Sequence, residues 1–151
     1  MISVRLTPRE GQVVRELAEG GTLKSVAEKL GITQITAKSY RNDAARKVGS
    51  SAVHSALVAA AYDAEVLEIP PSDGARVTLA DGERELLPLL IAGYSTVQMS
   101  RKTYRNINGV RRDLRGLVTA LGGETDAHAV TRAYQLGLAG PRRQDAASAS
   151  A

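Results

Sequence analysis

The feature that most constrains this chain is an internal repeat. Shifted by 73 positions, residues 4–62 align with residues 77–135 without a gap. The identities fall at helix ends and at apolar positions, where a fold constrains its sequence most strongly. In a chain of 151 residues, this predicts two copies of one unit of about 60 residues. The matched pairs are Val4/Val77, Leu6/Leu79, Glu10/Glu83, Leu17/Leu90, Gly20/Gly93, Lys29/Lys102, Gly49/Gly122, Ala56/Ala129 and Ala60/Ala133.

Local signals divide the first copy into four helices. Thr7 is typical of an N-cap, Pro8 of a first helical position, and Glu10 completes a capping box. A three-residue turn separates the second helix from the third, which is the helix-turn-helix arrangement. We therefore predict an all-α fold of two tandem four-helix helix-turn-helix units. In the first copy, the helices are expected from Pro8 to Gly20-Gly21, from Leu23 to Leu30 with Thr22 as cap and Gly31 as stop, from the Thr33 cap to about Lys47 before Gly49, and from Ala52 to Tyr62.

Apolar residues at helical spacing predict the core of the first copy. The smallest positions are Ala37 and Ala44 in the third helix, so Tyr40 is expected to fill the space beside them. The fourth helix carries small residues that allow another helix to approach closely. The expected inward positions are Val13, Val14, Leu17, Ala18, Val26, Ala27, Leu30, Ala37, Tyr40, Ala44 and Val48, and the residues of the fourth helix that allow this approach are Val53, Ala56, Leu57 and Ala60.

Composition excludes several classes of protein. The chain has no Cys, Trp or Phe, so disulfide scaffolds, thiolate metal sites and large aromatic stacking platforms are not expected. No apolar run approaches the roughly 18 residues of a membrane span, and no signal peptide is apparent, which favours a cytoplasmic protein. The net charge is +4, and basic residues lie in two blocks, 1–62 and 77–138, on either side of an acidic connector. Two compact basic blocks favour nucleic acid as the partner.

Spaced motifs in both copies carry a family resemblance. They are Leu6-Thr7-Pro8-Arg9-Glu10, Leu17-Ala18-Glu19-Gly20, Val26 to Thr33, Thr36-Ala37-Lys38 and Arg46-Lys47-Val48-Gly49, and in the second copy Glu83, Leu86-Leu87, Leu89-Leu90, Gly93-Tyr94-Ser95-Thr96, Val110-Arg111-Arg112 and Leu121-Gly122. With these residues the first copy resembles the LuxR-type DNA-binding domain, and the second copy is similar to it at fewer positions; the two resemblances together cover about 120 residues. Members of this family usually carry a receiver or small-molecule domain ahead of the DNA-binding unit, and because the first copy begins close to Met1, neither domain is expected here.

The resemblance implies that the third helix of each copy enters the major groove of DNA. Helical geometry agrees, because Gln34, Lys38 and Asn42 lie on one face, opposite Ala37 and Ala44. Arg and Lys can bond guanine, whereas Asn and Gln can pair with adenine. The base-contact candidates are Gln34, Lys38, Ser39, Asn42, Asn108, Arg111, Arg112 and Arg115. The phosphate-contact candidates, some at helix N-termini, are Thr22, Thr33, Thr36, Arg41, Arg46, Lys47, Ser95, Arg101, Lys102 and Arg105.

The second copy departs from the family pattern at four positions. Pro88 interrupts its first helix and is expected to kink it, and Tyr104 stands where the first copy has the turn glycine. Gly109 lies inside the third helix. Asp113 takes an inward-facing position, where a carboxylate needs a partner such as Arg84 or Arg112. This copy therefore either grips the DNA backbone more than it contacts bases, or binds a protein partner.

The connector and the tail complete the predicted organisation. The 14-residue connector contains Pro70-Pro71 and could span at most ~46–50 Å, against the roughly 34 Å between successive major-groove half-sites. The Ala- and Ser-rich tail is expected to be disordered. The predicted divisions are residues 1–62 for the first unit, 63–76 for the connector, 77–138 for the second unit and 139–151 for the tail.

These features predict a double-stranded DNA-binding bacterial transcription regulator, not an enzyme. Two alternatives stay open, a protein-interaction module that modulates another regulator and a weakly specific architectural DNA-binding protein. The fourth helices could pair within one chain or between two chains of a homodimer. Catalytic residues, cofactors and metal ligands are not expected, since His54 and His128 stand alone and no phosphate-binding or nucleophile motif occurs.

Overall fold

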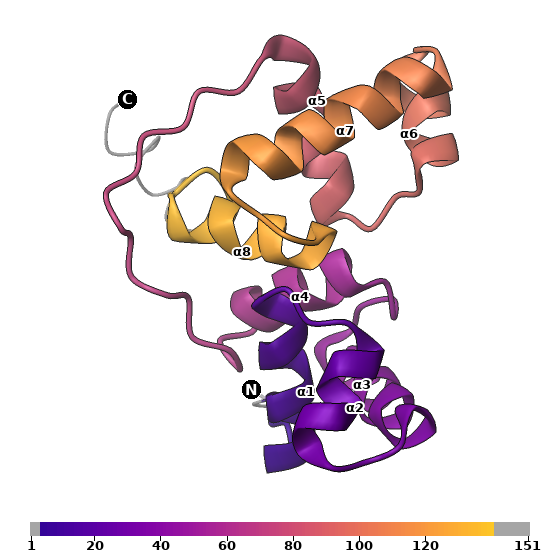
Figure 1. The fold of residues 1–151 in the computed structure, drawn as a ribbon, viewed down its shortest axis with the longest axis vertical. Coiled ribbons are helices and arrows are strands. Elements are labelled where there is room, and N and C mark those ends of the chain that lie inside the picture. The colour runs from indigo at the N-terminus through magenta and orange to yellow at the C-terminus, as the bar shows by residue number, and fades with distance from the viewer. Residues whose placement is uncertain (1–3, 141–151) are drawn as a thin grey trace.

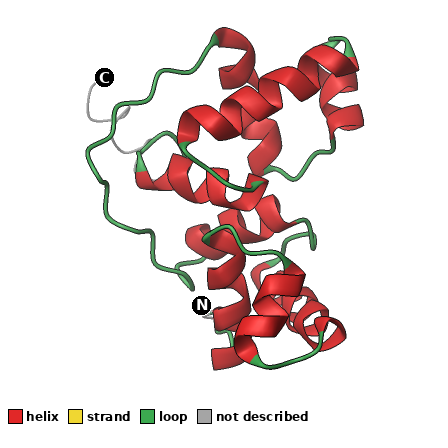
Figure 2. Cartoon of the chain, in the orientation of Figure 1, coloured by secondary structure: helices red, strands yellow, loops and turns green. Residues whose placement is uncertain are grey.

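The computed structural model describes residues 4–140, and in that part of the chain it contains eight α-helices and no strand (Figure 2). The predicted all-α class is confirmed. The predicted tail, 139–151, lies almost wholly outside the described residues. We call helices α1–α4 unit 1 and helices α5–α8 unit 2. Unit 1 contains α1 (Pro8–Ala18), α2 (Leu23–Leu30), α3 (Gln34–Val48) and α4 (His54–Asp63), and unit 2 contains α5 (Asp81–Ile91), α6 (Thr96–Thr103), α7 (Ile107–Leu121) and α8 (Asp126–Gln135).

The first three helices of each unit follow the 73-residue repeat, and the fourth helix departs from it by one residue. Helices α5, α6 and α7 begin and end 73 residues after α1, α2 and α3, but α8 begins 72 residues after α4. The loop before α8 is one residue shorter than the loop before α4. The gapless alignment is therefore wrong over the fourth helix, where Tyr62 corresponds to Tyr134 and Val58 to Val130.

Side-chain caps determine where most of these helices begin. Thr7 and Glu10 form the predicted capping box of α1, and Thr22 and Thr33 cap α2 and α3 as expected. The fourth helix begins at His54 instead of Ala52, after an N-cap valine that offers no hydrogen-bond acceptor. In unit 2, α5 continues across Pro88, which lies exposed near its end.

Helix α4 lies at the centre of the molecule (Figure 1). Seven of its ten residues are buried, because α1 and α3 cover one side and α8 packs against the other. A helix buried on every side is apolar all round, and α4 consists largely of Ala, Val and Leu. Leu57 and Val58 are fully buried within it and belong to one hydrophobic core that runs through both units.

The two units meet along α4 and α8, a contact that we call the α4/α8 seam. Tyr62 and Tyr134, which are equivalent residues, stack with their ring centroids 5.1 Å apart. The Tyr62 hydroxyl bonds Thr131 Oγ1 at 2.9 Å, and the Tyr134 hydroxyl donates to the carbonyl of Ala59 at 3.4 Å and to Asp63 Oδ1 at 2.9 Å. Thr131 and Ala59 are themselves equivalent positions. Equivalent residues that contact one another reciprocally are the mark of an isologous, two-fold contact.

The glycines that follow α1 and α5 repeat this symmetry at the edge of the seam. A Cβ atom placed on Gly20 would lie 3.1 Å from Glu124 Oε2, and one placed on Gly93 would lie 2.9 Å from the Cβ atom of Ala56. Each glycine thus lets its unit approach the start of the other unit's fourth helix. The chain therefore folds as an approximate two-fold pair of units, with the axis passing between Tyr62 and Tyr134.

The segment between the units packs against the molecule. No helix occurs between Asp63 and Asp81, but Leu67 and Leu79 are buried at its two ends. In its middle, Asp73 Oδ2 accepts a hydrogen bond from Arg132 Nη1 at 3.0 Å, and the Pro71 carbonyl accepts one from the Gln135 side chain at 2.8 Å. The segment therefore runs beside α8 (Figure 1) and is held there. None of the helices in residues 4–140 combines the length and the apolar character needed to cross a membrane.

Candidate nucleic-acid interface

Helix α3 turns its small residues inward and its polar residues outward. Ala37 and Ala44 are fully buried against the core of unit 1, and Tyr40 is half-buried beside them. Such close packing on alanine brings the α3 backbone near α1 and leaves the opposite face of α3 in solvent. The exposed residues on that face are Gln34, Ile35, Lys38, Ser39, Asn42 and Arg46. Lys38 makes no ion pair within residues 4–140.

Ile35 is a surface residue that the sequence reasoning did not select. Its side chain is 83% exposed at the second position of α3, next to the amide of Gln34 and one turn before Lys38 and Ser39. An isolated exposed apolar side chain is ordinary on a protein surface. On a helix that faces the major groove it can contact the methyl group of thymine. The sequence signal that could have identified Ile35 is its position, because this isoleucine does not belong to the apolar stripe of its helix.

Helix α7 presents a more basic surface than α3. Val110, Leu117 and Leu121 fix its inward face and are fully buried. Arg111 and Arg115 are exposed one turn apart on the other side, and within residues 4–140 neither makes an ion pair. Asn108 and Arg112 are exposed with them; the Arg112 side chain is 74% exposed although its Nε lies 3.4 Å from Asp113 Oδ1.

Hydroxyl candidates for phosphate contacts stand at helix N-termini. Thr22 and Ser95 each accept a hydrogen bond from a backbone N–H in the first turn of α2 and α6, so both mark the amino end of a helix, where anions are favoured. Thr33 caps α3, and its hydroxyl donates to Thr36 Oγ1 at 2.9 Å.

The remaining basic candidates differ in their contacts. Arg101 is exposed, and Lys102 Nζ lies 5.0 Å from the ring centroid of Tyr94. Arg46 pairs with Asp43 at 3.1 Å on an exposed surface, where such a pair contributes little. Arg41 is half-buried; its guanidinium donates to Asn42 Oδ1 at 2.9 Å and to His54 Nε2 at 3.2 Å.

Lys47, one of the predicted phosphate contacts, makes an ion pair within unit 1. Its Nζ donates to Oε1 of the buried Glu10 at 2.7 Å and ties α3 to α1. Burial alone raises the pKa of Glu10, but the hydrogen bonds from Lys47 and from the Thr7 N–H, with the Lys47 charge, lower the pKa below its usual range. The charge of Lys47 therefore compensates a buried carboxylate inside unit 1.

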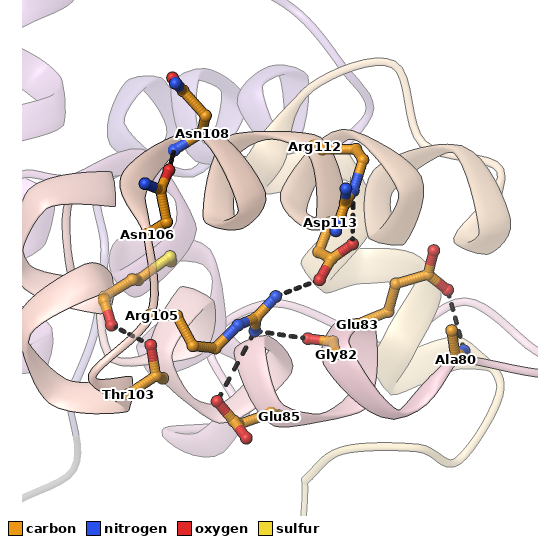
Figure 3. A network of polar contacts seen from close by, with 11 residues as sticks. Ala80, Gly82, Glu83, Glu85, Thr103, Arg105, Asn106, Asn108, Arg112 and Asp113 are labelled. Carbon is orange, nitrogen blue, oxygen red and sulfur yellow. Dashed lines mark hydrogen bonds and ion pairs between the residues drawn. The ribbon is translucent and has the colours of Figure 1, made fainter.

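Arg105 is likewise used inside unit 2 (Figure 3). Its guanidinium pairs with Asp113 and with Glu85, and donates to the carbonyl of Gly82 at 3.3 Å. Arg105 and Asp113 are 23% and 20% exposed, so this largely shielded pair satisfies the inward-facing carboxylate. The predicted contact of Asp113 with Arg112 is confirmed, whereas the predicted contact with Arg84 is wrong.

Arg84 has other partners because it faces the start of its own helix. It pairs with Asp81 and donates to the carbonyl of Leu79. Arg105 was missed as the partner of Asp113 because the two residues belong to different elements and meet only across the turn before α7. Unit 1 has Ile32 and Tyr40 at the positions of Arg105 and Asp113, so the ion pair of unit 2 stands where unit 1 has an aliphatic and an aromatic side chain.

Neither histidine belongs to a cluster that could hold a metal ion, and residues 4–140 contain no such cluster. Burial and the guanidinium of Arg41 lower the pKa of His54, which keeps its Nε2 available as an acceptor. His128 Nδ1 accepts a hydrogen bond from the N–H of Glu124 at 3.0 Å and so organises the loop before α8.

Comparison with protein families places unit 1 among known domains. Residues 4–61 match the family model described as bacterial regulatory proteins, luxR family. The match begins before α1 and ends within α4, and it includes α3. Comparisons with curated proteins and with solved structures gave no match. Residues 4–61 are therefore similar to the helix-turn-helix domain of the luxR family, which supports a DNA-binding transcription regulator in general.

Proposed function

We propose that this protein regulates transcription by binding double-stranded DNA with the third helix of each unit, α3 and α7, in the major groove. The observation that carries the proposal is the exposed polar face of α3, which lies in the domain that matches the luxR family. The base-contacting residues are Gln34, Lys38, Ser39 and Asn42 on α3 and Asn108, Arg111, Arg112 and Arg115 on α7.

The proposal extends to unit 2 for two reasons. Its helices repeat the order and bounds of unit 1 as far as α7. The exposed face of α7 also carries basic side chains, among which Arg111 and Arg115 form no ion pair within residues 4–140. Uncompensated positive charge on a groove-sized helix is favourable beside phosphates and guanine. Phosphates are contacted by the amino ends of α2 and α6 and by the exposed Arg46, Arg101 and Lys102.

The test is binding of the purified chain to genomic and random-sequence duplexes at two salt concentrations. Affinity is expected to fall with salt, with a slope of roughly −0.9 per phosphate neutralised. The variants Lys38→Ala/Asn42→Ala and Arg111→Ala/Arg115→Ala should each weaken selective binding. The matched controls remove the same charge elsewhere: Arg76→Ala on the connector for the first, and Arg5→Ala/Arg76→Ala for the second.

The outcomes separate the possible functions. Loss of binding in the α3 and α7 variants but not in the controls supports the proposal. Equal effects in variants and controls would support a weakly specific architectural protein that senses only net charge. Absence of binding by the wild-type chain at low salt would refute the proposal and favour a protein-interaction module.

A further inference from the structure

The third helices of the two units occupy equivalent positions but carry different outward side chains. The approximate two-fold relation at the α4/α8 seam makes α3 and α7 counterparts. Outward positions of α3 and α7 correspond at an offset of 73 residues. At two of these positions α3 has an apolar or small residue where α7 has a polar or charged one. The pairs are Ile35/Asn108, Lys38/Arg111, Ser39/Arg112 and Asn42/Arg115, and all eight residues are exposed.

These differences change which bases each helix can contact. Asn42 can pair with adenine and Ile35 can contact the thymine methyl, while Lys38 provides one cationic contact to guanine. On α7, Arg111 and Arg115 are both available for bidentate contacts to guanine O6 and N7, and Arg112 is 74% exposed beside them. The face of α3 therefore favours A·T pairs with a single guanine, and the face of α7 favours guanine.

The α4/α8 seam also indicates that the two third helices are paired within one chain. In α4 seven of ten residues are buried, and in α8 six of ten. Tyr62 and Tyr134 are 4% and 2% exposed at the centre of the contact. Helices α4 and α8 thus cover each other within one chain, and neither keeps an apolar face for the fourth helix of a second chain.

We propose that one chain binds one operator whose two half-sites differ, an A·T-rich half-site under α3 and a guanine-rich half-site under α7. This inference rests on the proposed function and adds the class of DNA sequence that the site recognises. Because the two halves are unlike, the protein binds its operator in one orientation, and the operator has a direction.

The test is selection of bound sequences from a random duplex library, by the wild-type chain and by an exchange variant. The exchange variant carries Asn108→Ile, Arg111→Lys, Arg112→Ser and Arg115→Asn, which give α7 the outward residues of α3. All four positions are exposed, and circular dichroism verifies that the fold is kept. Native mass spectrometry of each complex counts the chains on a duplex.

The wild-type chain is expected to select a two-part sequence with dissimilar halves and to bind it as one chain. The exchange variant should select two similar halves. It should bind the wild-type operator about 5- to 150-fold more weakly for each bidentate arginine–guanine pairing that the substitutions remove. A palindromic wild-type sequence, two chains on each operator, or an unchanged second half in the exchange variant would overturn this inference. If the wild-type chain enriches no sequence at all, the proposed function fails as well, so the two failures are distinguishable.

Discussion

Substitution of Gly93 by alanine tests the close approach of the two units. Gly93 has φ = +85°, and an L-residue in this region costs about 1–2 kcal/mol. The added Cβ atom would lie 2.9 Å from the Cβ atom of Ala56 on α4. An alanine methyl group cannot rotate away, so the units must move apart, and such overpacking costs about 1–3 kcal/mol. We expect Gly93→Ala to lower the free energy of unfolding by about 2–5 kcal/mol.

Gly31→Ala is the matched control for this substitution. Gly31 has φ = +68° and no atom within 4 Å of an added Cβ atom, so it is expected to incur only the backbone cost of about 1–2 kcal/mol. Urea unfolding followed by far-UV circular dichroism measures both variants. A double-mutant cycle with Ala56→Gly then isolates the steric contribution. Equal losses in Gly93→Ala and Gly31→Ala, with no coupling in the cycle, would refute the described approach of α5 to α4.

Three further predictions concern single contacts. Arg105→Ile should destabilise unit 2 by about 1–3 kcal/mol because it leaves the shielded Asp113 carboxylate without its main partner. Adding Asp113→Tyr should recover most of the lost stability. Thermal unfolding of the double variant that shows no recovery would contradict this prediction. The pKa of His54 is lowered from 6.5, so below pH 6.5 the unfolded chain takes up a proton more readily than the folded one. The free energy of unfolding should therefore fall between pH 7.5 and 5.5, and urea titrations of His54→Gln should show a weaker dependence on pH. Tyr104 has φ = +56° and is 95% exposed. Tyr104→Gly should therefore raise the free energy of unfolding by about 0.5–1 kcal/mol, and a lower melting temperature of this variant would disprove the prediction.

The sequence was sufficient for features that depend on neighbouring residues. Thr7, Thr22 and Thr33 are caps because each hydroxyl reaches a backbone N–H three residues ahead, and that spacing is visible in the sequence. The exposed face of α3 follows from helical periodicity in the same way. The helix-turn-helix assignment of unit 1 therefore needed no coordinates.

Contacts between distant residues were beyond the same reasoning. Lys47 and Glu10 are 37 positions apart, and only the packing of α3 on α1 shows that the lysine compensates a buried carboxylate. The sequence did not show that α8 is shifted by one residue. Alanines are so frequent in both fourth helices that offsets of 72 and 73 residues both give identities. The choice between pairing of α4 and α8 in one chain and pairing between chains depended on whether the connector allows the units to meet.

The seam within one chain has a consequence for gene dosage. Two identical subunits that must first associate form their paired surface in proportion to the square of their concentration when they are scarce. Here the two halves are joined by a short connector, and linked modules meet at an effective concentration in the millimolar range. The paired surface is therefore complete in every folded molecule, however few copies are present. Under the proposed binding of one operator by one chain, occupancy is expected to rise in direct proportion to the amount of protein at low expression, without the threshold that a dimerisation step imposes.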